Sequence, residues 1–463
     1  MIKLYNDFKV KRFEYIYFFV MIIYMAQATS YTSRMVGGLT ARPLFPFLLP
    51  ILLTIILLDR NKISFSHNGL SKILFIISIW TGCIIYKESL YSDKELSYYF
   101  FLFYAIIIAY IHVRVFGNKL FPLYEKIMVH ICIIALGLWL FAVLVPSSAS
   151  LFRSFQEIHY GRNVFFIFTW MDPAQGQVEN GIIRNAGLSW EPGRFAIMVL
   201  LAIYCNLLRN GIKFKNNRSV LILLLTMIST QSTTGYIGTL ALYAFWGLKN
   251  FNMGYILGIT FLMIPIAYYA SQLSFMKEKI EKQLDLDYEL EKLDETIDYV
   301  NEVKQRNEYV ASVGRFQAMY FEYQNIQEDP ILGYGISSRN SYFSTHTSSN
   351  FILTGGILKI FGQYGIPLGL LLYFFLYKSS VRIGKEHGKN KGALFVIFII
   401  SSVSYVIFLV PVFTAFWFYG IFRKDIPIEY IKSKSEDTKS DEKTDSEEEI
   451  EEEVNKDEDI LHS

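Results

Sequence analysis

The sequence predicts an all-α, polytopic transmembrane helix bundle of about 12 spans, and three observations lead to this fold class. Hydrophobic residues make up 52% of the chain and aromatic residues 17%. Apolar runs of spanning or near-spanning length recur along it, and loops rich in lysine and arginine alternate with loops that hold few. A soluble protein would have to expose much of this apolar surface, whereas lipid accepts it directly.

The individual spans follow from the criterion of about twenty consecutive apolar residues, applied with wide tolerance. The hydroxyl-rich junction Ser229–Gly235 favours close helix packing over ligand binding. The runs on either side of it, and those around Pro411, each form either a tight hairpin or one long, broken span. The first run has features of a cleaved signal peptide, but the many later spans favour an uncleaved helix. The predicted spans lie at roughly 13–31, 43–58, 72–86, 97–113, 127–146, 189–208, 219–231, 233–248, 252–271, 350–378, 392–409 and 411–422.

Lysine and arginine predict the orientation, because cytoplasmic loops carry the excess of both residues. With the N-terminus in the cytoplasm, the basic loops all fall on the cytoplasmic side, and an even number of spans returns the C-terminus there. The basic residues of these loops are Arg60, Lys62, Arg114, Lys119, Lys126, Arg209, Lys213, Lys215, Arg218, Lys378, Arg382, Lys385, Lys389, Lys391, Arg423 and Lys424.

The chain divides into a transmembrane domain, 1–432, and a tail, 433–463. The tail is acidic and nearly free of apolar residues, so it is predicted to be disordered and cytoplasmic. We favour a solvated appendage over a docking segment for a basic partner. Within the domain, 271–349 forms the largest outside loop, and such a long loop suggests a functional cap. An amphipathic helix inside it is predicted from the spacing of Leu286, Leu290, Leu293, Ile297 and Val300.

The first polar segment with chemical interest is Arg184–Ala196, at the outer end of a predicted span. Pro192 suits the first turn of a helix, and Glu191 would lie beside the positive end of that helix. An interfacial ion pair of Glu191 with Arg194 or Arg184 and a functional site are equally favoured by this charge pattern.

The second polar segment lies in and after the large loop. Arg315 begins a helical stretch that ends before Asp329-Pro330, and the glycine-rich turn 331–336 follows. His346 and Asn350 then stand at the start of the next span. Arginine suits a phosphate ligand, because its planar guanidinium binds phosphate bidentately and stays charged.

Other chemistries lack their motifs in this sequence. It has no Walker lysine loop, no HEXXH motif and no cysteine pairs, which argues against ATP hydrolysis and zinc chemistry. Its charge balance, a formal net charge of +2, argues against nucleic-acid binding. We therefore expect no metal and no cofactor.

The polar segments together resemble those of bacterial O-antigen and capsular polysaccharide polymerases and of O-antigen ligases. Arg184–Ala196 is similar to their R-x-x-G-x-x-x-E-P pattern, and Arg315 with Pro330–Gly335 is similar to their R…P-L-G-x-G segment. The run from His346 to Gly365 resembles their H-N…G-x-x-G segment. The resemblance covers about residues 180–380. Ligases often have Asn directly after His, whereas here Asn350 lies four residues past His346, which favours a polymerase.

The resemblance implies a GT-C-like fold with a large extracytoplasmic helical loop, in the bacterial cytoplasmic (inner) membrane. It implies a metal-independent inverting glycosyltransferase that joins polyprenyl-pyrophosphate-linked oligosaccharide repeat units at the outer face. The partners would be that lipid-linked substrate, membrane lipid and a chain-length regulator protein. Arg184, Arg194 and Arg315 would bind the pyrophosphate, and Glu191 or His346 would act as the general base.

Three other functions stay open. An O-antigen ligase shares nearly all of these features. A flippase for lipid-linked sugars would predict internal repeats and charges along a central path, and we find no repeat in the sequence. A membrane scaffold acting through the acidic tail would leave the outer arginines unexplained.

The topology can be tested with alkaline phosphatase, which is active only outside the cytoplasm. We expect an active enzyme when it is fused within 280–310 and an inactive one when it is fused in the basic loop near 213–215. An inactive fusion within 280–310 would overturn the predicted orientation.

Overall fold

A computed structural model of the protein describes most of the chain in a series of segments. The chain divides into two units, Met1–Phe422 and Arg423–Ser463, and all elements named below belong to the first. The predicted span 252–271, the amphipathic helix 286–300 and the acidic tail 433–463 lie outside the described residues. The structure describes 11–27, 44–61, 67–89, 96–145, 162–165, 167–171, 183–189, 191–212, 217–248, 315–335, 340–342, 356–405, 407–408 and 410–423.

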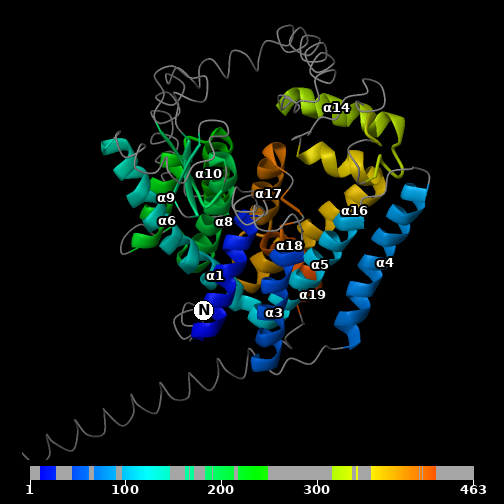
Figure 1. The fold of residues 1–463 in the computed structure, drawn as a ribbon, viewed down its shortest axis with the longest axis horizontal. Coiled ribbons are helices and arrows are strands. Elements are labelled where there is room, and N and C mark those ends of the chain that lie inside the picture. Colours follow the sequence, from blue (N-terminus) through cyan, green and yellow to red (C-terminus); the bar gives the residue numbers. More distant parts are fainter. Residues whose placement is uncertain are drawn as a thin grey trace, which may run out of the picture. The chain divides into compact units, whose positions relative to one another are not determined.

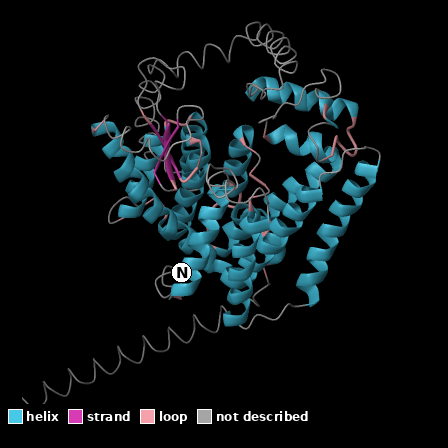
Figure 2. Ribbon diagram, in the orientation of Figure 1, coloured by secondary structure: helices cyan, strands magenta, loops and turns pink. Residues whose placement is uncertain are grey.

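Helices dominate the described part of the chain (Figures 1 and 2). Most of them coincide with the predicted apolar runs, because a continuous apolar run in lipid must satisfy its own backbone hydrogen bonds as a helix. The helices are α1 (Arg12–Gln27), α3 (Leu44–Asn61), α4 (His67–Ser89), α5 (Leu96–Phe116), η2 (Gly117–Lys119), α6 (Leu120–Leu144), α8 (Pro192–Asn210), α9 (Arg218–Thr230), α10 (Thr233–Leu248), α14 (Arg315–Glu328), α16 (Ile357–Glu386), α17 (Ala393–Ser404), α18 (Pro411–Trp417) and α19 (Tyr419–Phe422).

Within the residues that the structure describes, three helical stretches are long and apolar enough to cross a membrane. The first, Phe103–Leu144, contains α5 and α6 on either side of the short helix η2; the other two are α8 and α16. Shorter apolar helices cover Ser71–Cys83, Arg218–Thr230 and Ala393–Ser404. The fold is thus mostly helical, and its apolar helices indicate membrane association. The dozen spans and the GT-C-like loop stay predictions.

The ends of α8, α10, α16 and α17 gather in two separate places. At one, Thr234 Oγ1 at the start of α10 lies 2.5 Å from Ser404 Oγ at the end of α17. At the other, Asn390 Nδ2 in the turn after α16 donates to Phe245 O near the end of α10, at 2.8 Å. Helices α10 and α17 therefore run in opposite directions, as helices that cross a membrane in alternate directions do. Which of the two places faces the cytoplasm stays a prediction.

The last part of the bundle is not a single helix. The sequence places one span at 411–422, whereas the structure has the short helices α18 and α19 there, preceded by extended chain after Ser404. Tyr405, Ile407 and Phe408 in this connection are all buried. Non-helical backbone is tolerated inside a membrane protein only where protein surrounds it, which this burial provides. Pro411 begins α18, because its missing N–H costs nothing in the first helical turn.

Helix α16 is interrupted at Gly365, which has φ 76° and ψ 165°. Pro367 follows, and its lack of an N–H removes the usual helical donor for Gln363 O. Gly335 N supplies this donor instead, at 3.0 Å. The interruption therefore has a partner in the glycine-rich turn that comes before α16 in the sequence.

Two further backbone hydrogen bonds complete this pairing. Tyr334 N donates to Gly362 O at 2.8 Å, and Ile366 N donates to Pro330 O at 2.7 Å. The turn after α14 and the break in α16 thus satisfy each other's backbone groups. The glycine-rich turn and the G-x-x-G segment that ends at Gly365 therefore form one structural unit.

A small antiparallel sheet was missing from the all-α prediction. Strands β1 (Arg162–Phe165), β2 (Phe168–Met171) and β3 (Arg184–Gly187) pair in that order between α6 and α8 in the sequence, and Figure 2 shows them in magenta. The predicted spans stop at 146 and resume at 189, so the prediction treated this segment as a connection and assigned no strand to it. The run from Val164 to Trp170 has high strand propensity, but each strand has only four residues, which is a short pattern to recognise in a sequence.

The pairing of the turn with α16 can be tested by adding a methyl group at Gly333. This residue has φ 67°, and a Cβ there would lie 2.3 Å from Gly362 O. We expect Gly333→Ala to destabilise the protein by about 2–4 kcal/mol, because it combines backbone strain with a backbone clash. The measurement is the melting temperature of the purified protein in detergent. The control is Gly137→Ala in α6, where no atom lies within 4 Å of the new methyl group and no destabilisation is expected. Equal melting temperatures for the two variants would contradict the pairing.

Candidate functional site

The motif around Glu191 forms the start of α8, as the sequence predicts. Glu191 has extended dihedral angles, φ −140° and ψ 135°, and Pro192 is the first helical residue. The backbone N–H groups of Arg194 and Phe195 donate to Glu191 O at 3.2 and 3.3 Å. The Glu191 side chain makes no capping hydrogen bond to this helix. Arg194 therefore lies in the first turn of α8, a helix whose residues are nearly all buried.

Arg194 packs against Tyr405, the residue that ends α17. The guanidinium carbon lies 5.1 Å from the centre of the Tyr405 ring, which is cation–π geometry. Gly193 makes this approach possible, because a Cβ there would lie only 2.9 Å from Tyr405 Oη. Glu191 also interacts electrostatically with Arg194. Pairing of Glu191 with Arg194 is thus compatible with a functional role for this motif, since one glutamate does not neutralise every positive charge near it.

Lys359 brings a second positive charge to the same place. It lies in the first turn of α16, whose preceding residue, Gly356, contacts the end of α17 so closely that a Cβ would lie 1.6 Å from Ser402 O. Lys359 and Arg194 are near enough to repel each other electrostatically. Two cations from different helices therefore converge beside Tyr405.

Glu322 of α14 provides the opposing charge. Its side chain is fully buried, with 0% exposure. Asn325 Nδ2 donates to Oε2 at 3.0 Å, and Tyr334 Oη donates to Oε1 at 3.4 Å. Burial raises the pKa of Glu322 from 4.5 to about 7, and the nearby positive charge of Lys359 limits the rise. We call Arg194, Lys359, Tyr405 and Glu322 the charged cluster.

The backbone unit at the break of α16 holds Glu322 in place. A Cβ at Gly362 would lie 2.2 Å from Glu322 Oε2, so the carboxylate rests directly on the α16 backbone. Tyr334, whose hydroxyl reaches the same carboxylate, is anchored through its N–H to Gly362 O. The glycine-rich turn thus serves the cluster indirectly, because it fixes α14 against the first part of α16.

Arg184 lies at the C-terminal end of α9. It begins β3, and its Nε and Nη2 donate to Thr230 O and Gln231 O at 3.3 and 3.0 Å. These carbonyls lie at the C-terminal end of α9, where a positive charge stabilises the helix dipole. Asn185 Nδ2 also donates to Ser229 Oγ at 3.0 Å. The strand therefore caps the hydroxyl-rich junction between α9 and α10.

The predicted site residues fall into three groups. Arg194 and Glu191 lie together in the cluster region, and Arg184 lies at the end of α9. Arg315 is the first residue of α14, which confirms the predicted helix start, but its side chain lies outside the described part, as does all of His346. The pyrophosphate role of the arginines and the catalytic roles of Glu191 and His346 stay predictions.

Sequence reasoning missed Lys359 and Glu322. A signal for Lys359 was present, because it is a lysine inside a predicted span, and ionisable residues at that depth are rare and functional by default. Glu322 gave a weaker signal, because carboxylates on a loop helix are usually solvated. Its burial depends on the docking of α14 onto α16, which only the tertiary structure shows.

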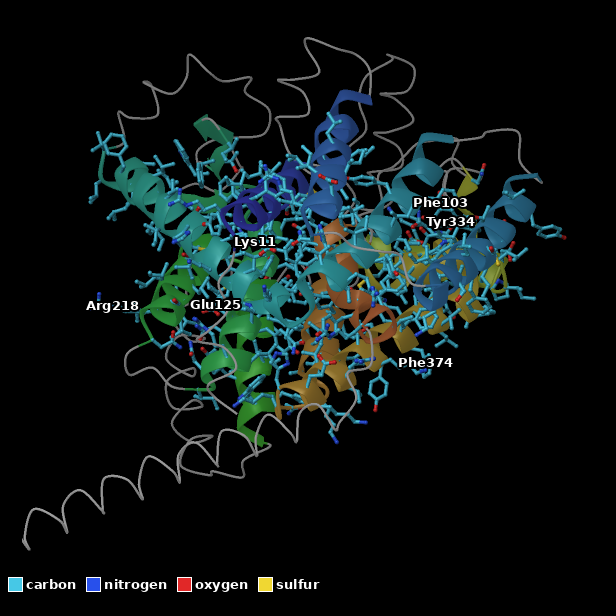
Figure 3. The ribbon with its side chains drawn as sticks, turned by 90° about the horizontal axis from the view of Figure 1, so that it is seen from below. Lys11, Phe103, Glu125, Arg218, Tyr334 and Phe374 are labelled. Atoms are coloured by element: carbon cyan, nitrogen blue, oxygen red, sulfur yellow. The ribbon has the colours of Figure 1, made fainter. Side chains whose placement is uncertain are left out.

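A second buried polar cluster joins the other ends of α6, α8 and α9. Arg209 Nη2 and Asn206 Nδ2 both donate to Glu125 Oε1, at 2.5 and 2.6 Å. Asn206 and Asn217 exchange two hydrogen bonds at 3.1 and 2.8 Å. Figure 3 shows Glu125 well separated from Tyr334 of the first site. The side chains of this second cluster bind one another, and the best-supported role of the cluster is to hold α6, α8 and α9 together.

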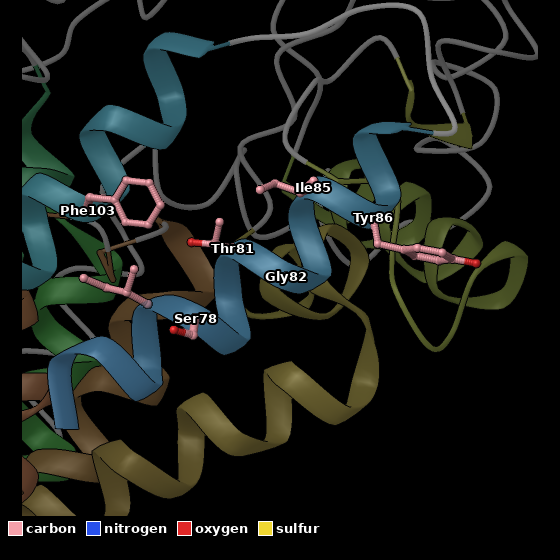
Figure 4. Close-up of a pocket in the computed structure, with 7 residues that line it drawn as sticks. Ser78, Thr81, Gly82, Ile85, Tyr86 and Phe103 are labelled. Carbon is pink, nitrogen blue, oxygen red and sulfur yellow. The ribbon is translucent and has the colours of Figure 1, made fainter. Parts of the chain in front are cut away.

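A groove between α4 and α5 is lined by uncharged residues (Figure 4). It has a volume of about 820 Å³ and is mostly apolar. Thr81 and Ile85 of α4 face Phe103 of α5, whereas Tyr86 points away from it. None of the charged-cluster residues lines this groove.

No protein-family model matches the chain. No curated protein matches it significantly. Among the described residues, no three or more His, Cys, Asp and Glu side chains are grouped as metal ligands would be. Functional inference therefore depends on the charged cluster itself.

The raised pKa of Glu322 predicts a pH-dependent stability. In the unfolded chain the carboxyl group titrates near 4.5, and in the folded protein near 7. The folded state therefore binds the proton more tightly, and this contribution, present below pH 4.5, is lost as the pH rises toward 7. Its size is on the order of 3 kcal/mol. We expect Glu322→Gln, which cannot ionise, to melt at a higher temperature than the wild type at pH 8 and at a similar one at pH 5.

The control for this measurement is Glu328→Gln, at the exposed end of the same helix. It should leave the melting temperature nearly unchanged at both pH values. A wild-type protein that gains stability from pH 5 to pH 8 relative to Glu322→Gln would contradict the assigned direction.

Proposed function

We propose that the protein is a glycosyltransferase that joins polyprenyl-pyrophosphate-linked oligosaccharide repeat units into a polysaccharide at the outer face of the bacterial cytoplasmic membrane. The observation that carries this proposal is the convergence of Arg194 and Lys359 at the ends of α8 and α16. Two cations at the end of a helical bundle suit a ligand whose charged group lies at the membrane surface while its lipid tail lies in the bilayer. A lipid pyrophosphate has this chemistry.

The reaction needs positive charge at the leaving group. A hydroxyl oxygen of one repeat unit attacks the anomeric carbon of the other substrate, the bond from that carbon to the pyrophosphate oxygen breaks, and its electron pair leaves with the pyrophosphate. Negative charge on the leaving group therefore grows in the transition state. Arg194 and Lys359, held by packing before the substrate arrives, would stabilise this charge more than the ground state. A single displacement inverts the anomeric configuration.

A base must take the proton of the attacking hydroxyl. Glu191 is the described candidate, because it interacts electrostatically with Arg194 and is only partly buried. His346, from the segment just before α16, is the second candidate from the sequence. Arg194 has two supports in this scheme, the cation–π contact to Tyr405 and the charge of Glu191, so its guanidinium is oriented without a hydrogen bond to the substrate.

The alternatives differ in what they require of the cluster. An O-antigen ligase would use the same cations on the same donor and transfer the glycan to a lipid acceptor. A flippase would need to release the pyrophosphate on both sides of the membrane. We favour the polymerase because of the spacing of His346 and Asn350, and the length distribution of the glycan distinguishes the three.

The proposal predicts that Arg194→Ala and Lys359→Ala each abolish long polysaccharide while single lipid-linked units persist. The expected loss is at least about 100-fold in polymer, because each change removes charge stabilisation of the leaving group. Gel ladders of the glycan from cells expressing each variant provide the measurement. Arg315→Ala is expected to behave in the same way.

The matched control is Arg218→Ala, an exposed arginine at the start of α9. It should give a normal ladder at a similar amount of membrane-inserted protein. Normal chain-length ladders from both Arg194→Ala and Lys359→Ala would refute the proposed role of the cluster. Single added units on a lipid acceptor would indicate the ligase.

A further inference from the structure

The charged cluster contains one buried carboxylate for its two converging cations. Glu322 lies fully inside the protein and interacts electrostatically with Lys359, which in turn lies near Arg194. The titratable groups that act on Glu322 in the described part of the chain are Lys359 from α16 and Tyr334 from the turn after α14. Before any ligand arrives, Glu322 is therefore the negative charge that balances Lys359.

An anion bound to Arg194 and Lys359 changes this balance. It would neutralise Lys359 from the other side and would place a second negative charge near the buried carboxylate. Both effects disfavour ionised Glu322, because a like charge and the loss of a counter-charge each raise the cost of a buried anion. Water cannot offset this cost, since the Glu322 side chain has 0% exposure.

We infer that the charged cluster is a proton-coupled anion site, in which binding of a pyrophosphate group to Arg194 and Lys359 is accompanied by uptake of up to one proton from solvent by Glu322. The carboxylate becomes a neutral carboxylic acid, so negative charge of the bound pyrophosphate replaces the negative charge of Glu322. When the anion leaves, Glu322 releases the proton and again balances Lys359. The identity of the anion as a pyrophosphate rests on the proposed function.

The hydrogen bonds around Glu322 are compatible with both protonation states. Oε2 accepts from Asn325 Nδ2, and Oε1 lies 3.4 Å from Tyr334 Oη. A neutral carboxylic acid can keep the bond from Asn325 and donate its proton to the tyrosine oxygen, whose hydroxyl can rotate. The pKa of Glu322, about 7 without a ligand, places the transition where physiological pH changes its occupancy.

The exchange also gives the site a means of releasing its product. Without a competing carboxylate, Lys359 would hold pyrophosphate tightly after the reaction. Ionised Glu322 competes with the anion for Lys359, so each proton lost from Glu322 favours release. By linkage, the affinity for the anion must fall as the pH rises through the titration range of Glu322.

The test is the binding of inorganic pyrophosphate to the full-length protein in detergent, measured by isothermal titration calorimetry between pH 6 and pH 8. Pyrophosphate itself titrates in this range, so Glu322→Gln provides the reference. We expect the wild type to bind about ten-fold more tightly at pH 6 than at pH 8 beyond the change seen in Glu322→Gln. At pH 8, Glu322→Gln should bind at least as tightly as the wild type, because its competing charge is gone.

A second readout requires no change in affinity. At pH 7.5, heats measured in buffers of different ionisation enthalpy give the number of protons taken up, and the wild type should take up more than Glu322→Gln. Glu328→Gln, exposed on the same helix, should match the wild type in both measurements. A purely structural role of Glu322 would weaken binding at every pH without altering the pH dependence.

The outcomes separate this inference from the proposed function. Identical pH profiles and proton uptake in wild type and Glu322→Gln would overturn the proton coupling, even if Arg194→Ala abolishes both pyrophosphate binding and polymer. Pyrophosphate binding that survives in Arg194→Ala and Lys359→Ala would overturn the anion site. A normal glycan ladder in those variants, whatever the calorimetry shows, would instead refute the polymerase.

Discussion

The structure depends above all on the backbone pairing between the glycine-rich turn and the interrupted helix α16. Gly365 and Pro367 together deprive Gln363 O of a helical donor, and an unsatisfied buried carbonyl costs on the order of 1–3 kcal/mol. The N–H of Gly335 removes that cost. Through this pairing, a segment of the loop between α10 and α16 becomes part of the bundle. The position of α14, and with it the position of Glu322, follows from three backbone hydrogen bonds.

The limited exposure of its charges explains why the charged cluster combines two cations with a carboxylate and an aromatic ring. A half-buried cation is stabilised by a partner, and Arg194 has the Tyr405 ring and Glu191, while Lys359 has Glu322. Loss of the Tyr405 ring or of Glu191 would leave Arg194 less well compensated in a poorly solvated place, whereas replacing Glu322 also removes the cost of burying that carboxylate. The glycines at 193 and 356 contribute by their small size, because they allow three helix ends to meet within contact distance. Packing and electrostatics thus meet at the same few residues.

Much of the fold could be predicted from the sequence, because lipid imposes a simple rule on apolar segments. Helix positions and the start of α8 at Pro192 followed from hydrophobic runs and capping residues. The sheet did not, because its three four-residue strands lie in a connection between two predicted spans and form only short sequence patterns. The position of Arg184 could not be predicted either, since the carbonyls that it caps belong to a helix that comes later in the sequence. Glu322 required the docking of α14, which depends on contacts distant in sequence.

Helix α8 shows what surrounding a membrane helix with protein does to its composition. The most apolar 18-residue window of Phe103–Leu144 has a mean hydropathy of 2.7 with 39% of the window buried, whereas that of α8 has only 1.3 with 89% buried. Helix α8 is surrounded by neighbouring helices rather than by lipid, and this environment suits an asparagine or a glycine better than lipid does. Among the three candidate spans in the described residues, the most buried one therefore has the lowest hydropathy. Searches that weight segments by apolarity will rank such an enclosed helix below its less buried neighbours.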